Sequence, residues 1–125
     1  MQRWSGCLVL VWPALASAHQ GTGAHGGLVA DAGPYYAELT LQENRLQFFV
    51  FDDRTDAPVP IGAASPTATV LVGQETQTVT LRPGPSGTGD NVMVGQLEKN
   101  AGAGARIVVL IQLPGKPSIV ARFAF

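Results

Sequence analysis

Two histidines are the residues of this chain whose type and spacing could support chemistry. His19 and His25 are its only histidines, and both lie in the glycine-rich stretch 19–27. His19 directly follows Ala16-Ser17-Ala18, small residues at the positions that a signal peptidase recognises. If cleavage follows Ala18, the free α-amine and the imidazole Nδ1 of His19 can chelate one metal ion. The glycines between the two histidines allow His25 to loop back and supply a third nitrogen.

Three nitrogens in a near-square arrangement suit Cu(II), and imidazole also suits Zn²⁺. The amine titrates at about pH 8 and the imidazole at about pH 6.5, so a strongly binding metal can displace both protons at neutral pH. The sequence therefore predicts a metal site at His19 and His25, with copper or zinc as the cofactor. The alternative is that both histidines are solvated, because their separation of six residues matches no fixed ligand spacing.

The first eighteen residues have the three parts of a secretory signal peptide. Arg3 supplies positive charge, an apolar run follows over residues 7–15, and the cleavage motif ends at Ala18. The run is too short for a membrane-spanning helix, which needs about 20 residues. The alternative is an N-terminal helix packed into the core. We expect residues 1–18 to direct the chain to the periplasm and to be removed there.

Composition narrows the function classes of the processed chain. Cleavage removes Cys7, the only cysteine, which excludes an internal disulfide and thiol catalysis. Removal of Arg3 leaves seven basic residues against nine acidic ones, a balance that argues against nucleic-acid partners. No phosphate-binding loop or nucleophile motif is present, and no basic amphipathic stretch indicates membrane insertion. We therefore expect a domain that is not an enzyme.

The elements that must position the histidines are β-strands. Residues 35–41 and 45–51 alternate between apolar and polar side chains, and the short connection 42–44 predicts a hairpin. Four consecutive apolar residues over 48–51 predict burial on both faces of a strand or a β-bulge. Pro114-Gly115 predicts a type II turn. Further strands are expected over residues 67–72, 76–82, 92–97, 105–113 and 118–125.

These strands predict the domain organisation. No segment keeps a helical period for three turns, and turn residues recur every eight to twelve positions. Residues 28–125 are predicted to form an antiparallel, immunoglobulin-like β-sandwich of seven to eight strands, with a small barrel as the alternative. Residues 19–27 contain four glycines and no large apolar side chain, so we expect a flexible segment there unless a ligand gathers it.

Two further groups of side chains are candidates for function. Asp52, Asp53 and Asp56 lie in one loop after a strand and could contribute oxygen ligands to Ca²⁺. Their spacing is not that of a calcium loop, so a solvated turn in which Asp supports the backbone is the favoured interpretation. Tyr35 and Tyr36 could lie at a surface that binds a protein partner. The alternative is that one ring is buried and the other covers a neighbouring strand.

One stretch of the chain resembles a known family. His25-Gly26-Gly27, followed by Gly33-Pro34-Tyr35-Tyr36-Ala37-Glu38-Leu39, resembles the "HGG … G-x-Y-x-x-E-L" opening of small periplasmic β domains. Phe49-Val50-Phe51-Asp52-Asp53 and Ala57-Pro58-Val59-Pro60 are similar to the next strand and loop of that family. Such domains occur alone or with periplasmic adaptor subunits of heavy-metal efflux pumps. The resemblance covers roughly residues 25–60 and implies transition-metal handling, with His25 as a ligand.

Two hypotheses of function follow. The first is a periplasmic accessory protein that binds copper or zinc through His19 and His25, with components of metal transport as its partners. The chain itself has no helical hairpin and no methionine cluster, so it is neither a pump adaptor nor a typical Cu(I) carrier. The second hypothesis is a metal-independent, immunoglobulin-like module that binds a protein partner through an exposed strand edge.

The predicted cleavage site can be tested directly. Intact-mass measurement of the exported protein is expected to show a chain that begins at His19. A chain that begins at any other residue would eliminate the chelate formed by the amine and imidazole of one terminal residue.

Overall fold

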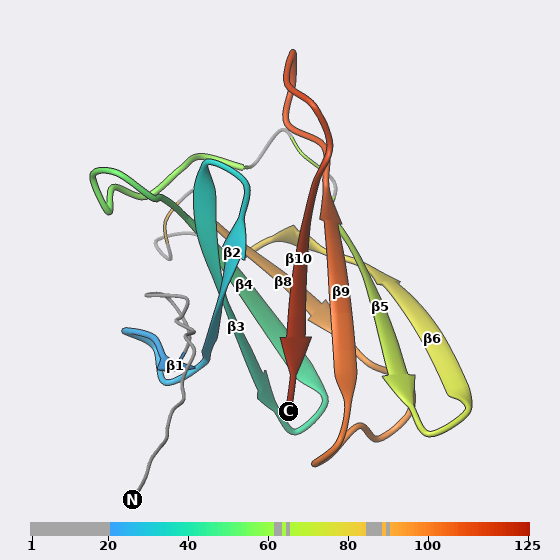
Figure 1. The fold of residues 1–125 in the computed structure, drawn as a ribbon. Coiled ribbons are helices and arrows are strands. Elements are labelled where there is room, and N and C mark those ends of the chain that lie inside the picture. The colour runs from blue at the N-terminus through green and yellow to red at the C-terminus, as the bar shows by residue number, and fades with distance from the viewer. Residues whose placement is uncertain (1–20, 62–63, 65, 85–88, 90) are drawn as a thin grey trace, which may run out of the picture.

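The computed structural model describes residues 21–61, 64, 66–84, 89 and 91–125 (Figure 1). The predicted signal peptide and His19 lie outside these residues. The described chain forms ten β-strands, and no helix in it is long and apolar enough to cross a membrane. The strands are β1 (Gly21–Thr22), β2 (Leu28–Ala32), β3 (Tyr35–Gln42), β4 (Arg45–Asp52), β5 (Thr67–Val72), β6 (Glu75–Thr80), β7 (Arg82–Pro83), β8 (Val92–Gln96), β9 (Arg106–Ile111) and β10 (Ile119–Ala124).

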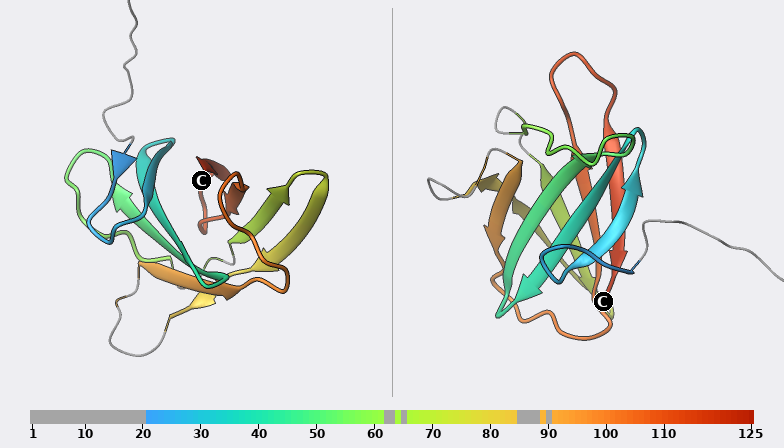
Figure 2. Two further views of the ribbon diagram at one scale, coloured as in Figure 1. Left: turned by 90° about the horizontal axis from the view of Figure 1, so that it is seen from below. Right: turned by 90° about the vertical axis from the view of Figure 1, so that its left-hand side faces the viewer.

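The strands form two antiparallel sheets that face one another. The six-stranded sheet has the order β1-β2-β3-β4-β8-β7, and the four-stranded sheet has the order β10-β9-β5-β6. Figure 2 shows the sheets as two layers, and β10 lies beside β2 where their edges approach. These two strands are not paired in a ladder, so the sheets do not close into a barrel. The predicted antiparallel β-sandwich is confirmed. Seven to eight strands were predicted, seven of them by residue range, and the structure adds to these seven β2 and the two-residue β1 and β7.

Alternation of side chains on β3 and β4 separates the core from the outer face of the six-stranded sheet. Ala37 and Leu39 on β3, and Phe48 and Val50 on β4, point inward and are fully buried. Facing them are the inward residues of β9 and β10, and Phe123 contacts the Phe48 ring edge-on, with a centroid separation of 6.3 Å and an interplanar angle of 89°. The intervening residues of β3 and β4 therefore occupy the opposite, outer face.

The apolar run over residues 48–51 is buried on both faces, as one of the two sequence interpretations predicted. Phe48 and Val50 lie in the core, whereas Phe49 lies on the outer face and is nevertheless only 7% exposed. The strand pairs with β3 without a bulge, from Gln42 opposite Arg45 to Tyr35 opposite Asp52. A second layer of chain must therefore cover the outer face at Phe49.

The predicted turns are also confirmed. Glu43 and Asn44 form the two-residue connection between β3 and β4, and both have positive φ, as the favoured hairpin turns require. Pro114 and Gly115 occupy the centre of a turn closed by a hydrogen bond from the Lys116 N–H to the Leu113 carbonyl. Gly115 has a φ of 70°, which a type II turn requires at its third residue.

The position of the core can be tested by truncating Phe48. Because this ring is completely buried and contacts Phe123, Phe48→Ala is expected to lower the free energy of unfolding by about 3–5 kcal/mol. Urea denaturation followed by circular dichroism measures the change. Leu110→Ala is the control, since that side chain is 47% exposed, and its effect is expected to stay within about 0.5 kcal/mol. Equal losses in the two variants would contradict this assignment of the core.

Candidate functional site

The centre of the candidate site is Glu38, a carboxylate on the outer face of the six-stranded sheet. Its neighbours Ala37 and Leu39 point into the core, so alternation directs the Glu38 side chain away from the core. Such a side chain is normally solvated, yet Glu38 is only 1% exposed. The chain that covers it is residues 21–27, which cross the outer face of this sheet (Figure 2).

Three hydrogen bonds compensate Glu38 for its burial. Oε2 accepts the backbone N–H groups of His25 and Gly27, each at 2.8 Å. Oε1 lies 2.8 Å from Nδ1 of the His25 ring. An unpaired buried carboxylate would be strongly destabilising, whereas bonds to an ionised acceptor are short and among the stronger hydrogen bonds in proteins. The carboxylate and residues 23–27, which we call the 23–27 loop, therefore stabilise one another.

The glycines of the 23–27 loop are required by close packing. Gly23 N–H donates to the Gly27 carbonyl at 2.8 Å, and Gly26 N–H donates to the Gly23 carbonyl at 3.0 Å. A Cβ at Gly23 would lie 2.4 Å from the Glu38 carboxyl carbon. A Cβ at Gly27 would lie 2.4 Å from the backbone oxygen of Leu39. The loop can approach the sheet this closely only because these positions have no side chain.

An aromatic stack fixes the plane of the His25 ring. The ring lies flat on Phe49, with a centroid separation of 3.8 Å and an interplanar angle of 4°. Phe51 is the next ring, at 6.4 Å from His25, and Tyr36 stacks on Phe51 at 5.1 Å. The His25 side chain remains 43% exposed, so it covers Phe49 and still contacts solvent.

This arrangement assigns different roles to the two ring nitrogens of His25. Nδ1 faces a carboxylate, which can only accept, so a neutral ring carries its proton on Nδ1. The lone pair of the neutral ring is then on Nε2. This is the arrangement in which a histidine binds a metal ion through one nitrogen while a carboxylate orients it through the other. The half-exposed ring can therefore offer Nε2 as a nitrogen ligand in a defined orientation.

The structure places one of the two predicted ligands. His25 lies in the 23–27 loop, whereas His19 falls in the part of the chain that is not described. Residues 21–27, which composition led us to expect to be flexible, form β1 and a loop bonded to Glu38. Residues 21–27 are ordered because this segment is hydrogen-bonded to Glu38, a carboxylate of the sheet, and not because of an external ligand. No group of three His, Cys, Asp or Glu side chains close enough to hold a metal occurs among the described residues.

Sequence reasoning missed Glu38 as a site residue. Its position on the polar face of an alternating strand is ordinary, and its partners lie 11 and 13 residues earlier in the chain. One signal was present, because the stretch with the family resemblance contains His25, Gly27 and Glu38 together. The structure shows that these three residues are in direct contact.

The acidic loop after β4 is a backbone turn. Asp52 Oδ1 accepts the N–H groups of Arg54 at 2.8 Å and Thr55 at 3.1 Å, and these bonds lower the pKa of Asp52. Asp56 N–H donates to the Asp52 carbonyl at 2.9 Å, which tightens the same turn. The favoured sequence interpretation, a turn in which Asp supports the backbone, describes what Asp52 does here.

The two adjacent tyrosines differ in environment. Tyr35 is part of the core and is 8% exposed. Tyr36 lies on the outer face, covers Phe51, and has a raised pKa because of partial burial and then a hydrogen bond with Asp56. The pair therefore follows the alternative in which one ring is buried and the other covers a neighbouring strand.

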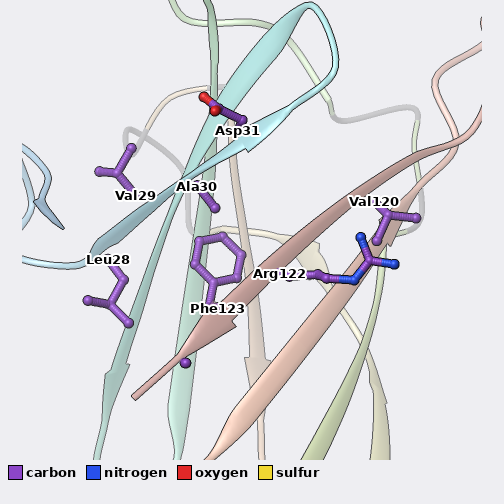
Figure 3. Close-up of a pocket in the computed structure, with 8 residues that line it drawn as sticks. Leu28, Val29, Ala30, Asp31, Val120, Arg122 and Phe123 are labelled. Carbon is purple, nitrogen blue, oxygen red and sulfur yellow. The ribbon is translucent and has the colours of Figure 1, made fainter. Parts of the chain in front are cut away.

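A groove lies between β2 and β10, at one edge of this sheet (Figure 3). Leu28 and Ala30 from β2 and Phe123 from β10 form much of its lining, with Asp31 and Arg122 at opposite sides. The groove follows the line where the edges of the two sheets meet without pairing. Its mostly aliphatic lining carries no grouping of nucleophile and base, so it does not suggest catalysis.

The chain matches no protein-family model, no curated protein and no solved structure. The resemblance of residues 25–60 to periplasmic β domains therefore stays a prediction from the sequence motif.

The close packing of Gly23 against Glu38 can be tested by adding a methyl group at residue 23. Gly23→Ala is expected to displace the 23–27 loop, because the new Cβ would overlap the buried carboxylate. Loss of the three bonds to Glu38 should cost about 1–3 kcal/mol of unfolding free energy and abolish hydrogen-exchange protection at the His25 and Gly27 amides.

Gly102→Ala is the matched control. A Cβ at Gly102 meets nothing within 4 Å, and the substitution has the same effect on the unfolded chain. Retention of the two protected amides in Gly23→Ala would show that the loop tolerates a side chain at residue 23.

Proposed function

We propose that this chain is an exported accessory protein that binds one Cu(II) or Zn²⁺ ion at its N-terminal segment. The observation that supports the proposal is the state of His25. A buried carboxylate bonds its Nδ1, Phe49 holds its plane, and the half-exposed ring has Nε2 left as the nitrogen for a ligand. Fixing a ligand in this way lowers the entropy that is lost when a metal binds.

The α-amine and imidazole of His19 would complete the ligand set. After cleavage at Ala18 both groups belong to the terminal residue, only six positions before His25. All donors in this set are nitrogens, which favours Cu(II) or Zn²⁺ over Cu(I). The processed chain has no cysteine, and its one remaining methionine, Met93, is buried in the core at 1% exposure. A soft sulfur site for Cu(I) therefore has no donor on the surface.

The proposed setting is the periplasm, and the proposed partners are components of metal transport. The signal-like first eighteen residues and the resemblance to domains associated with heavy-metal efflux systems support this setting. The β-sandwich would act as the carrier of the site, because β3 and β4 supply Glu38 and Phe49, the residues that hold His25 in place. No catalytic step is proposed for the protein.

The proposal predicts that the processed chain binds one equivalent of Cu(II) through nitrogen. Calorimetric titration should give the stoichiometry, and electron paramagnetic resonance should show the nitrogen ligands. Loss of one nitrogen donor is expected in His25→Ala, and loss of the terminal chelate in His19→Ala. An extra residue placed before His19 should act like His19→Ala, because it separates the amine from the imidazole.

Thr22→Ala is the control in the same segment, since Thr22 is exposed and lies on β1, outside the 23–27 loop. This variant should bind Cu(II) as the unmodified chain does. The proposal is wrong if the processed chain binds no Cu(II) or Zn²⁺, or if the three chains altered at His19 and His25 all bind with unchanged affinity and spectra. The first result would favour the metal-independent binding module, and the second would place the bound metal away from His19 and His25.

A further inference from the structure

We infer that Glu38 is a positioning residue that selects Nε2 of His25 as the metal-binding nitrogen and fixes the direction from which the ion approaches. The inference rests on the proposed function, because it assigns a role to Glu38 in that same site. Glu38 would not touch the metal. It would act through His25, by hydrogen bonds to both the ring and the backbone of this residue.

Glu38 determines which ring nitrogen of His25 is left for a metal. A histidine in a flexible segment can bind a metal through either ring nitrogen, and rotation of the side chain interconverts the two arrangements. Here Nδ1 lies 2.8 Å from Glu38 Oε1, so coordination through Nδ1 would require this contact to break. Breaking it would leave a carboxylate that is only 1% exposed without its side-chain partner. Binding through Nε2 leaves the buried contact intact.

Glu38 and Phe49 together fix the orientation of the His25 ring. The stack on Phe49 defines the ring plane, and the bond to Glu38 defines the direction of Nδ1 within that plane. Nε2 lies in the same plane, so its lone-pair direction is also defined. An anionic acceptor at Nδ1 additionally makes Nε2 a stronger donor to a metal ion.

Glu38 also holds the backbone of the 23–27 loop. The same carboxylate accepts the N–H groups of His25 and Gly27 at Oε2. Glu38 therefore fixes both the backbone and the ring of His25. A carboxylate bonded only to the ring would leave the backbone free to move. Glu38 takes part in all three of these hydrogen bonds, so a single substitution at this residue can test their role.

The experiment compares Glu38→Gln and Glu38→Asp in the processed chain. In the metal-free protein, ¹⁵N NMR of the neutral His25 ring should show the proton on Nδ1, and in Glu38→Gln a mixture of both tautomers. Cu(II) affinity should fall about 10–100-fold in Glu38→Gln, the usual effect of removing such an orienting partner. Glu38→Asp keeps the charge but shortens the reach, so an intermediate loss is expected. Glu98→Gln, an exposed position, is the control with the same chemical change.

Each outcome distinguishes the inference from the proposed function. If the unmodified chain binds Cu(II) and Glu38→Gln binds it equally well with an unchanged tautomer, Glu38 is not a positioning residue and the metal site stands. If the unmodified chain binds no metal, the proposed function and the metal role of Glu38 both fail, whatever the tautomer is. If Glu38→Gln does not fold, Glu38→Asp provides the same comparison, and unchanged affinity and tautomer in that variant overturn the inference.

Discussion

A carboxylate buried on the solvent side of a sheet is the constraint on which the site depends. Glu38 must have hydrogen-bond donors at both oxygens, and the 23–27 loop supplies three of them. To do so, the loop approaches so closely that Gly23 and Gly27 leave no room for a Cβ. The hydrogen bonds to Glu38 thus order a loop that has almost no apolar surface to bury. In this ordered position of the loop, the His25 ring lies on Phe49.

The fold contributes a rigid support and an apolar surface for this loop. β3 presents Glu38 and β4 presents Phe49 as direct cross-strand neighbours, so the two residues that hold His25 are fixed by one strand pair. Most of the core lies on the opposite face of the same strands. The loop can therefore be altered at Gly23 or His25 without changing a side chain in the interior. Loss of the bonds to Glu38 nevertheless lowers the stability of the fold, because it leaves a buried carboxylate unpaired.

The elements that were predictable from the sequence are those set by local pattern. Alternation along β3 and β4, the two-residue turn at Glu43 and Asn44, and the Pro114-Gly115 turn all depend on neighbouring residues. The order of residues 21–27 depends instead on Glu38, which follows the loop in the chain by more than ten positions. A glycine-rich composition correctly indicated a segment without a core of its own, but composition contains no information about a distant acceptor. His25 was identifiable by its chemistry, whereas its partner was not.

The two-sided burial of β4 has a consequence for how the chain finds its pairing. Within residues 48–51 alone, a slip of β4 by one position would exchange Phe48 and Val50 for Phe49 and Phe51 at little hydrophobic cost. The same slip would turn Leu46 out of the core and Gln47 into it, and a slip of β3 would turn Glu38 into the interior, away from the backbone amides of the loop. Polar residues on both strands thus exclude misaligned hairpins that the aromatic residues alone would permit.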